Sequence, residues 1–117
     1  MIEKVDCLKL HYACNEASQE LVLESKIQFT AQTPKDTSRT ERAILVDFHA
    51  EGDDGRFMLD CVCRVIFSFP EGEPPIEGQM LLNRYQAEAY AAMQQRFNGA
   101  MTAIGQAPID FPEISFQ

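Results

Sequence analysis

The chain has little of what a membrane span or a nucleic-acid-binding surface requires. No stretch approaches the about 20 apolar residues of a membrane-spanning helix, and the N-terminus has mixed charges and no apolar core, so we expect neither membrane insertion nor a signal peptide. Only 10 residues are Lys or Arg against 18 Asp or Glu, a net charge of −8. Nucleic acid and anionic membranes bind cationic patches, so neither is an expected partner. We expect an acidic, cytoplasmic protein with reduced cysteines.

Histidine is nearly absent, which limits both metal and nucleophile chemistry. The two histidines, His11 and His49, lie in no known nucleophile motif. His11 is close in sequence to Cys7 and Cys14, but strand alternation places Cys7 on the His11 side and Cys14 on the other. These three residues fall short of the four ligands of a tetrahedral metal site, so we expect no metal there.

Redox and phosphate-binding motifs are missing as well. Cys61 and Cys63 have the wrong spacing for a C-x-x-C pair and are interpreted as buried, inert thiols. The glycines fall in turns without the helix-opening context of a phosphate loop, and paired carboxylates stand in loops. The sequence therefore predicts no catalytic residue, no cofactor and no enzymatic activity.

What the sequence does contain is one long strand at residues 56–69. Its odd-numbered residues share an apolar face: Phe57, Leu59, Cys61, Cys63, Val65, Phe67 and Phe69. The other face is partly apolar too, at Met58, Val62 and Ile66. A strand in a one-sided sheet is polar there, so we expect a second partner for this strand: a helix, another subunit or a bound chain.

Three further strands are predicted, at residues 5–14, 21–31 and 41–51, from the alternation of apolar and polar side chains. A Gly-Asp-Asp-Gly turn at residues 52–55 predicts an antiparallel hairpin between the third strand and the long fourth strand. The length of 117 residues predicts one domain, residues 1–117.

A Pro- and Gly-rich crossover, one helix and an apolar tail complete the chain. The crossover, residues 70–78, has three prolines and is neither helix nor inner strand. The helix, residues 79–104, carries an apolar stripe at Leu82, Tyr85, Ala89, Met93, Phe97, Ala100, Met101 and Ile104. Asn98 belongs to its polar face, and Gly105 is the expected stop. The tail, residues 107–117, is too apolar to float free and should dock.

The order of elements predicts an α+β fold, a four-stranded antiparallel sheet with one long helix on one face. With this layout in view, two stretches are similar to SecB, the bacterial protein-export chaperone. The first runs from FMLDCVCRVIFSF to IEGQM, residues 57–80, and the second is APIDF, residues 107–111. The resemblance covers nearly the whole chain, although its motifs are mostly apolar patterns.

The resemblance implies a chaperone that captures unfolded or non-native polypeptide without ATP, assembled as a homotetramer from two dimers. It implies apolar grooves beside the sheet, under the crossover and the helix. By position, the client-binding candidates are Phe67, Phe69, Ile76, Met80, Leu82, Tyr85, Phe111 and Phe116. Flexible Met and flat aromatic side chains suit sequence-tolerant binding. The alternative is that these residues form the monomer core or a subunit seam.

The resemblance also implies docking on the SecA motor through an acidic sheet face. Met58 and Asp60 stand at the positions of an apolar and an acidic contact residue, although an outward carboxylate on a strand is ordinary. The chain stops at Gln117 and carries no basic, Cys- and His-bearing zinc tail, so tail-assisted transfer to SecA is not expected.

Two other functions compete with a general chaperone. The first is an interaction module with the same fold, dedicated to one folded partner. The second is a small-molecule binder or enzyme that uses the concavity between sheet and helix, for which the candidates are His49, Asp47 and Tyr85.

Overall fold

The computed structural model describes residues 1–14, 23–52 and 57–116. Four strands precede one helix: β1 (Ile2–Cys14), β2 (Leu23–Gln32), β3 (Glu41–Gly52), β4 (Phe57–Ser68) and α1 (Gly78–Ala103). The predicted elements are confirmed to within a few residues at each described boundary. The predicted turn at residues 52–55 lies largely outside the described residues, but the pairing it predicted is present.

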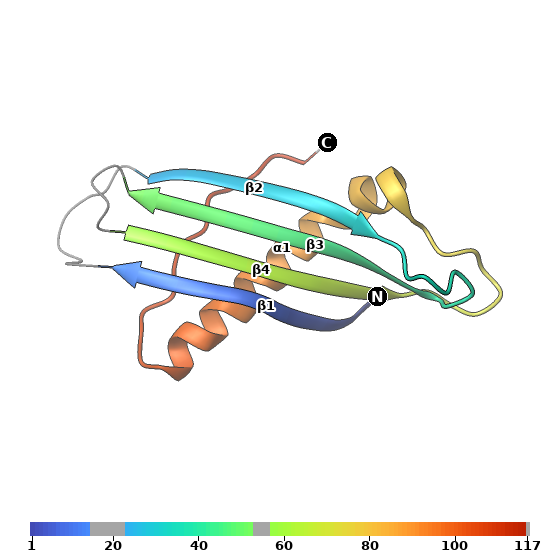
Figure 1. Ribbon diagram of the computed structural model, residues 1–117, viewed down its shortest axis with the longest axis horizontal. Helices are drawn as coiled ribbons and strands as arrows, with labels where there is room; N and C mark the ends of the chain where they lie inside the picture. Colours follow the sequence, from blue (N-terminus) through green and yellow to red (C-terminus); the bar gives the residue numbers. More distant parts are fainter. Residues whose placement is uncertain (15–22, 53–56, 117) are drawn as a thin grey trace.

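The sheet is antiparallel throughout, in the order β1-β4-β3-β2. Both edges are formed by the first two strands of the chain, and the long apolar strand β4 lies inside the sheet. Figure 1 shows α1 running diagonally behind the sheet, and the helix contacts all four strands. One face of the sheet is therefore covered by α1, and we call the other the open face.

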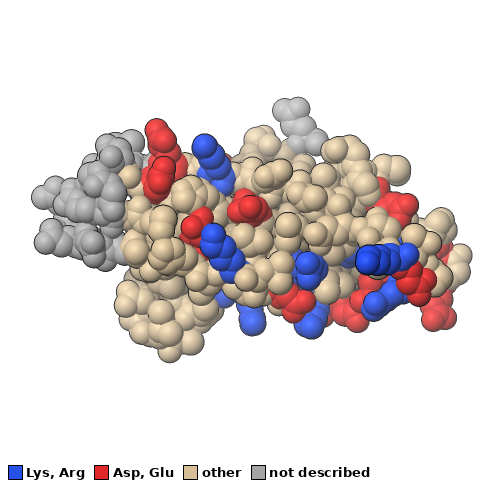
Figure 2. Space-filling model, viewed as in Figure 1, with Lys and Arg blue, Asp and Glu red and all other residues tan. Residues whose placement is uncertain are grey.

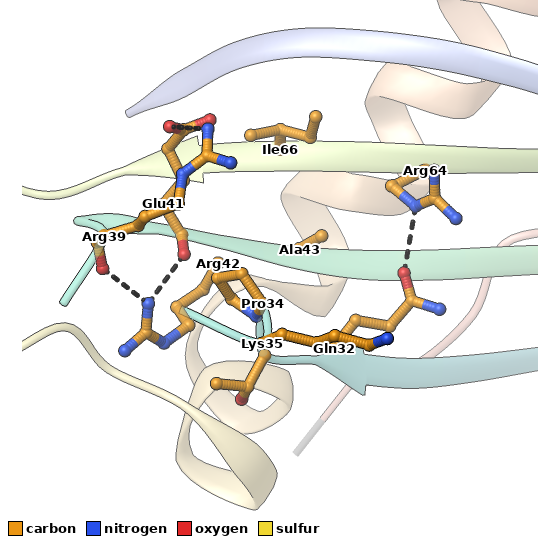
Figure 3. A pocket seen from close by; sticks show the side chains of 10 residues that line it. Gln32, Pro34, Lys35, Arg39, Glu41, Arg42, Ala43, Arg64 and Ile66 are labelled. Carbon is orange, nitrogen blue, oxygen red and sulfur yellow. Dashed lines mark hydrogen bonds and ion pairs between the residues drawn. The ribbon is translucent and has the colours of Figure 1, made fainter. Parts of the chain in front are cut away.

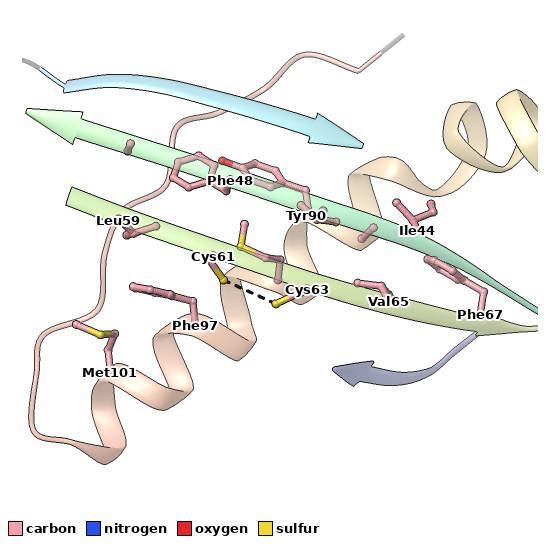
Figure 4. Packing of buried hydrophobic residues seen from close by; sticks show 14 of the residues in the cluster. Ile44, Phe48, Leu59, Cys61, Cys63, Val65, Phe67, Tyr90, Phe97 and Met101 are labelled. Atoms are coloured by element: carbon pink, nitrogen blue, oxygen red, sulfur yellow. Dashed lines mark hydrogen bonds between the residues drawn. The ribbon is translucent and has the colours of Figure 1, made fainter. Parts of the chain in front are cut away.

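The core lies between the sheet and α1 and is built from the alternation that the sequence predicted. Every odd-numbered residue of β4 is buried and every even-numbered one is half-buried. In Figure 4 the β4 side chains face Phe97 and Met101 of α1, and those of β3 face Tyr90. The even-numbered face of β4, with Val62 and Ile66, has no cover among the described residues, so its second partner stays a prediction.

Two predictions about the helix stripe are wrong. Ile104 is 71% exposed, because the chain leaves the helix there, whereas Leu81 and Tyr90 are buried although neither was placed in the stripe. The buried positions recur every four residues, which turns the buried face by about 40° at each step. The helix can bury this rotating face because the tail covers part of it. No helix in the described part of the chain is long and apolar enough to cross a membrane.

The helix ends where the sequence predicted. Gly105 has a φ of +82°, a backbone conformation that costs any other residue about 1 kcal/mol or more. The amide of Gly105 donates to the carbonyl of Thr102 at 3.0 Å, and that of Gln106 donates to Met101 at 2.8 Å. These are the two hydrogen bonds of a Schellman cap, and they turn the chain back toward the sheet.

The predicted side of Cys7 is also wrong. The pairing of β1 with β4 shifts by one residue between Cys7 and Lys9, which is a β-bulge. Before the bulge Cys7 lies opposite Cys63, on the helix side, and after it His11 lies opposite Asp60, on the open face. A shift of one residue moves the following side chains to the other face, so Cys7 and His11 are separated by the sheet.

Candidate functional site

The tail that follows α1 lies against a wall of aromatic rings. Figures 1 and 4 show it crossing the helix side of the sheet. Phe111 is half-buried, and its ring centroid lies 5.1 Å from that of Phe48 on β3 and 5.5 Å from that of Phe97 on α1. Both pairs meet edge to face, an arrangement that adds about 0.5–1.5 kcal/mol beyond burial. The prediction that the tail docks is confirmed.

The end of the tail uses a second set of rings. The ring centroid of Phe116 lies 5.7 Å from that of Phe29 on β2 and 6.2 Å from that of Tyr90 on α1, and both pairs again meet edge to face. Between the tail and the sheet a cavity of about 190 Å³ remains. It is lined by Ser25, Phe48, Ala50, Phe57, Leu59 and residues 109–112. The tail thus occupies an apolar groove, which we call the tail groove, without filling it.

Side chains of α1 hold the backbone of the tail. The Asn98 amide donates to the carbonyl of Ile109 at 3.1 Å and accepts from the amide of Ile109 at 2.8 Å. The Tyr90 hydroxyl donates to the carbonyl of Pro112 at 2.7 Å. Burial raises the pKa of Tyr90, which keeps this donor protonated. Asn98 was assigned to the solvent face, so its role was missed.

The chemistry of the tail groove suits any extended polypeptide. Every residue has a backbone carbonyl and every residue except proline a backbone N–H, so the contacts made by Asn98 and Tyr90 fix the path of a chain without reading its other side chains. The rings around Phe111 and Phe116 offer apolar contact area of adaptable shape. Its three hydrogen bonds from α1 side chains to the described part of the tail all involve backbone groups of the tail.

The structure divides the eight predicted client-binding residues into two groups. Phe111 and Phe116 belong to the tail and lie in the tail groove. The other six come from the end of β4, the crossover and the first turns of α1: Phe67, Phe69, Ile76, Met80, Leu82 and Tyr85.

Within this second group only Met80 is freely exposed. Tyr85 is half-buried, with its ring 5.1 Å from Phe67 and 6.2 Å from Phe69. Phe67 is completely buried, so it is a core residue in this chain, whereas 71% of Met80 is exposed. The group therefore contains a packed aromatic trio, Phe67, Phe69 and Tyr85, and one exposed side chain, Met80.

The crossover is fastened to the sheet by a buried arginine. Arg42 is only 3% exposed, and its Nε donates to the Glu77 carboxylate at 2.8 Å. Its other nitrogens donate to the carbonyls of Thr37, Arg39 and Glu41. Glu77 directly precedes α1, so Arg42 ties the start of the helix to the start of β3.

The open face carries the residues predicted to contact SecA. Met58 and Asp60 lie there, both half-buried. Asp60 is ion-paired with His49 on β3 and lies 3.8 Å from Nζ of Lys9 on β1. The hydrogen bond between His49 and Asp60 raises the pKa of the imidazole and lowers the pKa of the carboxylate. Figure 2 shows Lys and Arg interleaved with Asp and Glu on this face, which is thus mixed in charge rather than uniformly acidic.

A hollow of about 600 Å³, lined by charged residues and by Pro34, Ala43 and Ile66, lies where the open face meets the connector between β2 and β3 (Figure 3). Arg39 pairs with Glu41 at 2.8 Å, and Nε of Arg64 donates to the side-chain oxygen of Gln32 at 3.0 Å. Lys35 also lines it. These guanidinium groups have protein partners, so the hollow presents no convergent set of unpaired groups.

The three residues of the small-molecule hypothesis do not form a site. Asp47 and His49 lie on the open face, where they line a shallow hollow beside β2. Tyr85 packs on the helix side, against Phe67. The sheet separates them, because alternation along β3 turns Asp47 and His49 to the open face, whereas Tyr85 belongs to α1, which covers the other face. This arrangement contradicts the grouping of the three residues around one concavity.

The fold is similar to that of a solved SecB-like chaperone. This is Rv1957 of Mycobacterium tuberculosis, in complex with a ChAD peptide from the Rv1956 HigA1 antitoxin. The TM-score is 0.67 at 12% sequence identity, and the match covers 97% of this chain and 90% of that chain. No family model and no curated protein matches the sequence. At this identity the likeness establishes the fold: the chain has the α+β fold of SecB-like chaperones, as its sequence predicted.

Proposed function

We propose that the protein binds extended, non-native segments of polypeptide as an ATP-independent chaperone, and that they bind in the tail groove. The observation that carries the proposal is the tail itself. It is a stretch of irregular, extended chain held by aromatic rings and by side-chain hydrogen bonds to its backbone at Ile109 and Pro112. A groove that holds this segment without strand pairing has the properties that a client-binding groove requires.

The tail then acts as a built-in competitor. A client segment must displace residues 107–116 before it reaches the rings of Phe48 and Phe97. Its apparent affinity is therefore reduced by the fraction of molecules in which the tail is docked. The exposed side chain of Met80 offers an initial contact that needs no displacement.

Several properties accompany this proposal. The protein acts in the cytoplasm, catalyses no reaction and needs no nucleotide. It is a homo-oligomer, a dimer or a tetramer. Its clients are unfolded polypeptides rather than nucleic acid or lipid, since the net charge is −8.

The test is suppression of aggregation. A chemically denatured client is diluted into buffer with increasing amounts of the protein, light scattering is followed, and the size of the protein is measured in parallel. Suppression near stoichiometric ratios is expected. A labelled peptide of residues 106–117 should compete with the client for the same groove. A folded protein that leaves scattering unchanged at a tenfold excess rules out the chaperone proposal.

A second function is favoured by the solved relative, which was captured with one antitoxin peptide. In this version the groove serves a single partner whose affinity is high enough to displace the tail. One polypeptide that co-purifies at a fixed stoichiometry, combined with no effect on unrelated denatured clients, identifies this version.

Contact with SecA through Met58 and Asp60 is a separate proposal. Asp60 is half-buried beside His49, so Asp60→Asn removes its charge while keeping its shape. We expect this change to reduce any SecA association and to spare client binding, because the open face and the tail groove lie on opposite sides of the sheet. Unchanged association in a pull-down removes this proposal alone.

A further inference from the structure

Three of the four cysteines meet at one point of the fold, which the spacing of the sequence did not predict. Cys61 and Cys63 are neighbours on the helix side of β4, with their sulfurs 3.7 Å apart. The β-bulge in β1 brings Cys7 directly opposite Cys63. The sulfur atoms of all three lie within 4.8 Å of one another.

We propose that Cys7, Cys61 and Cys63 form a binding site for a thiophilic d10 metal ion, held by three sulfur ligands between β1 and β4. A metal–sulfur bond of about 2.3 Å places ligand sulfurs about 3.8–4.0 Å apart in tetrahedral or trigonal geometry. The sulfurs of Cys61 and Cys63, 3.7 Å apart, lie about 0.1 Å below this range, and all three sulfurs lie within 4.8 Å of one another, so little movement of Cys7 is needed. Thiolate ligands select soft ions such as Cu(I) and Zn(II).

The surroundings of the cluster fit this chemistry. Cys61 and Cys63 are completely buried, whereas Cys7 is exposed and lines a cavity of about 420 Å³ between β1 and the end of α1. The cavity gives an ion a path to the sulfurs. Arg96 lines the same cavity and supplies a positive charge beside ligands that become thiolates.

Cu(I) and Zn(II) differ in the number of ligands that each requires. No histidine, carboxylate or further thiol among the described residues joins the cluster. Cu(I) is satisfied by three sulfurs, whereas Zn(II) needs a fourth ligand, which water from the cavity would supply. In either case the thiol protons are released to solvent as the metal binds.

The experiment titrates the reduced full-length protein with each metal under anaerobic conditions. Cu(I) is competed against a chromogenic Cu(I) chelator, and Zn(II) against a chromogenic zinc chelator. Co(II) replaces zinc in a parallel sample, since its sulfur charge-transfer band reports thiolate ligands. We expect one equivalent of at least one metal to be retained, with three thiols protected from alkylation.

Two variants make the result specific. Cys7→Ser changes an exposed residue, so the fold should survive, and the affinity should fall at least about 10-fold. Cys14→Ser is the matched control: Cys14 lies opposite Phe57 in the register, seven residues along β1 and roughly 23 Å from Cys7. It should bind metal as the parent does. The assignment is overturned if the parent protein retains neither metal. It is also overturned if Cys7→Ser binds metal as tightly as the parent, or if Cys7→Ser and Cys14→Ser lose the same amount of metal affinity.

Discussion

Truncating Phe111 tests whether the tail is a competitor or a wall of the binding site. Phe→Ala costs about 3–5 kcal/mol in a full core, and Phe111 is half-buried, so Phe111→Ala should weaken tail docking by about 2 kcal/mol. The rings of Phe48 and Phe97 that receive it stay in place. A loss of about 2 kcal/mol makes the undocked tail about 30-fold more populated, since each 1.4 kcal/mol is a factor of ten.

The assay is fluorescence anisotropy of a labelled unfolded polypeptide titrated with each protein. We expect Phe111→Ala to bind up to about 30-fold more tightly than the parent, while its thermal unfolding midpoint falls, because the docked tail also stabilises the core. Glu113→Ala, an exposed change in the same tail, is the control and should alter neither quantity. Weaker binding by a folded Phe111→Ala protein would mean that clients rest on the tail, and would refute the reasoning.

Further predictions concern the helix end, the open face and the crossover anchor. Gly105→Ala should lower the free energy of unfolding by about 1 kcal/mol, measured in urea, whereas Gly99→Ala, where an added Cβ meets nothing within 4 Å, should raise it by up to about 1 kcal/mol. The raised pKa of His49 means that its pairing with Asp60 stabilises the protein below the ordinary value of 6.5 and is lost as the pH rises through the raised pKa. Discounted for solvent, this loss should be about 0.5 kcal/mol as the pH rises from the ordinary value through the raised pKa, and His49→Gln should abolish that pH dependence. Arg42→Met should destabilise the fold by about 3 kcal/mol or more, because it leaves the carbonyls that Arg42 serves without their donor; an unfolding curve like that of the parent would contradict the anchoring role.

The sequence predicted the fold because each element has its own periodic signal. The alternation in β4 and the Schellman glycine at Gly105 are local patterns that depend on no distant contact. The bulge in β1 also had a signal that was overlooked. Apolar residues occupy odd positions at Val5 and Cys7 and even positions at Leu10 and Tyr12, and such a change of phase marks an extra residue.

The tail groove could not be predicted in the same way. Tyr90 and Asn98 stand outside the regular apolar stripe. The ring of Tyr90 packs on Phe48 of the sheet, but its hydroxyl and the Asn98 side chain are hydrogen-bonded to the tail, which folds back over the helix. Apolar periodicity predicts the helix face that packs on one surface. When a helix also contacts a returning tail, the residues on that second face are polar or irregularly spaced, and the pattern assigns them to solvent. The three-sulfur cluster is likewise a product of tertiary register, since it joins strands about 55 residues apart in sequence.

The hydrogen bonds of Asn98 and Tyr90 also restrict where proline can stand in a polypeptide that replaces the tail in the groove. At the position of Ile109 the groove requires a backbone N–H as well as a carbonyl, so proline there forfeits one bond. Three residues further on, at Pro112, only a carbonyl is used, and proline is accepted at no loss. The positions of a client's prolines therefore add to its apolar side chains in deciding which stretch of the client chain fits the groove. Clients rich in proline would be held in few registers, and clients without it in many.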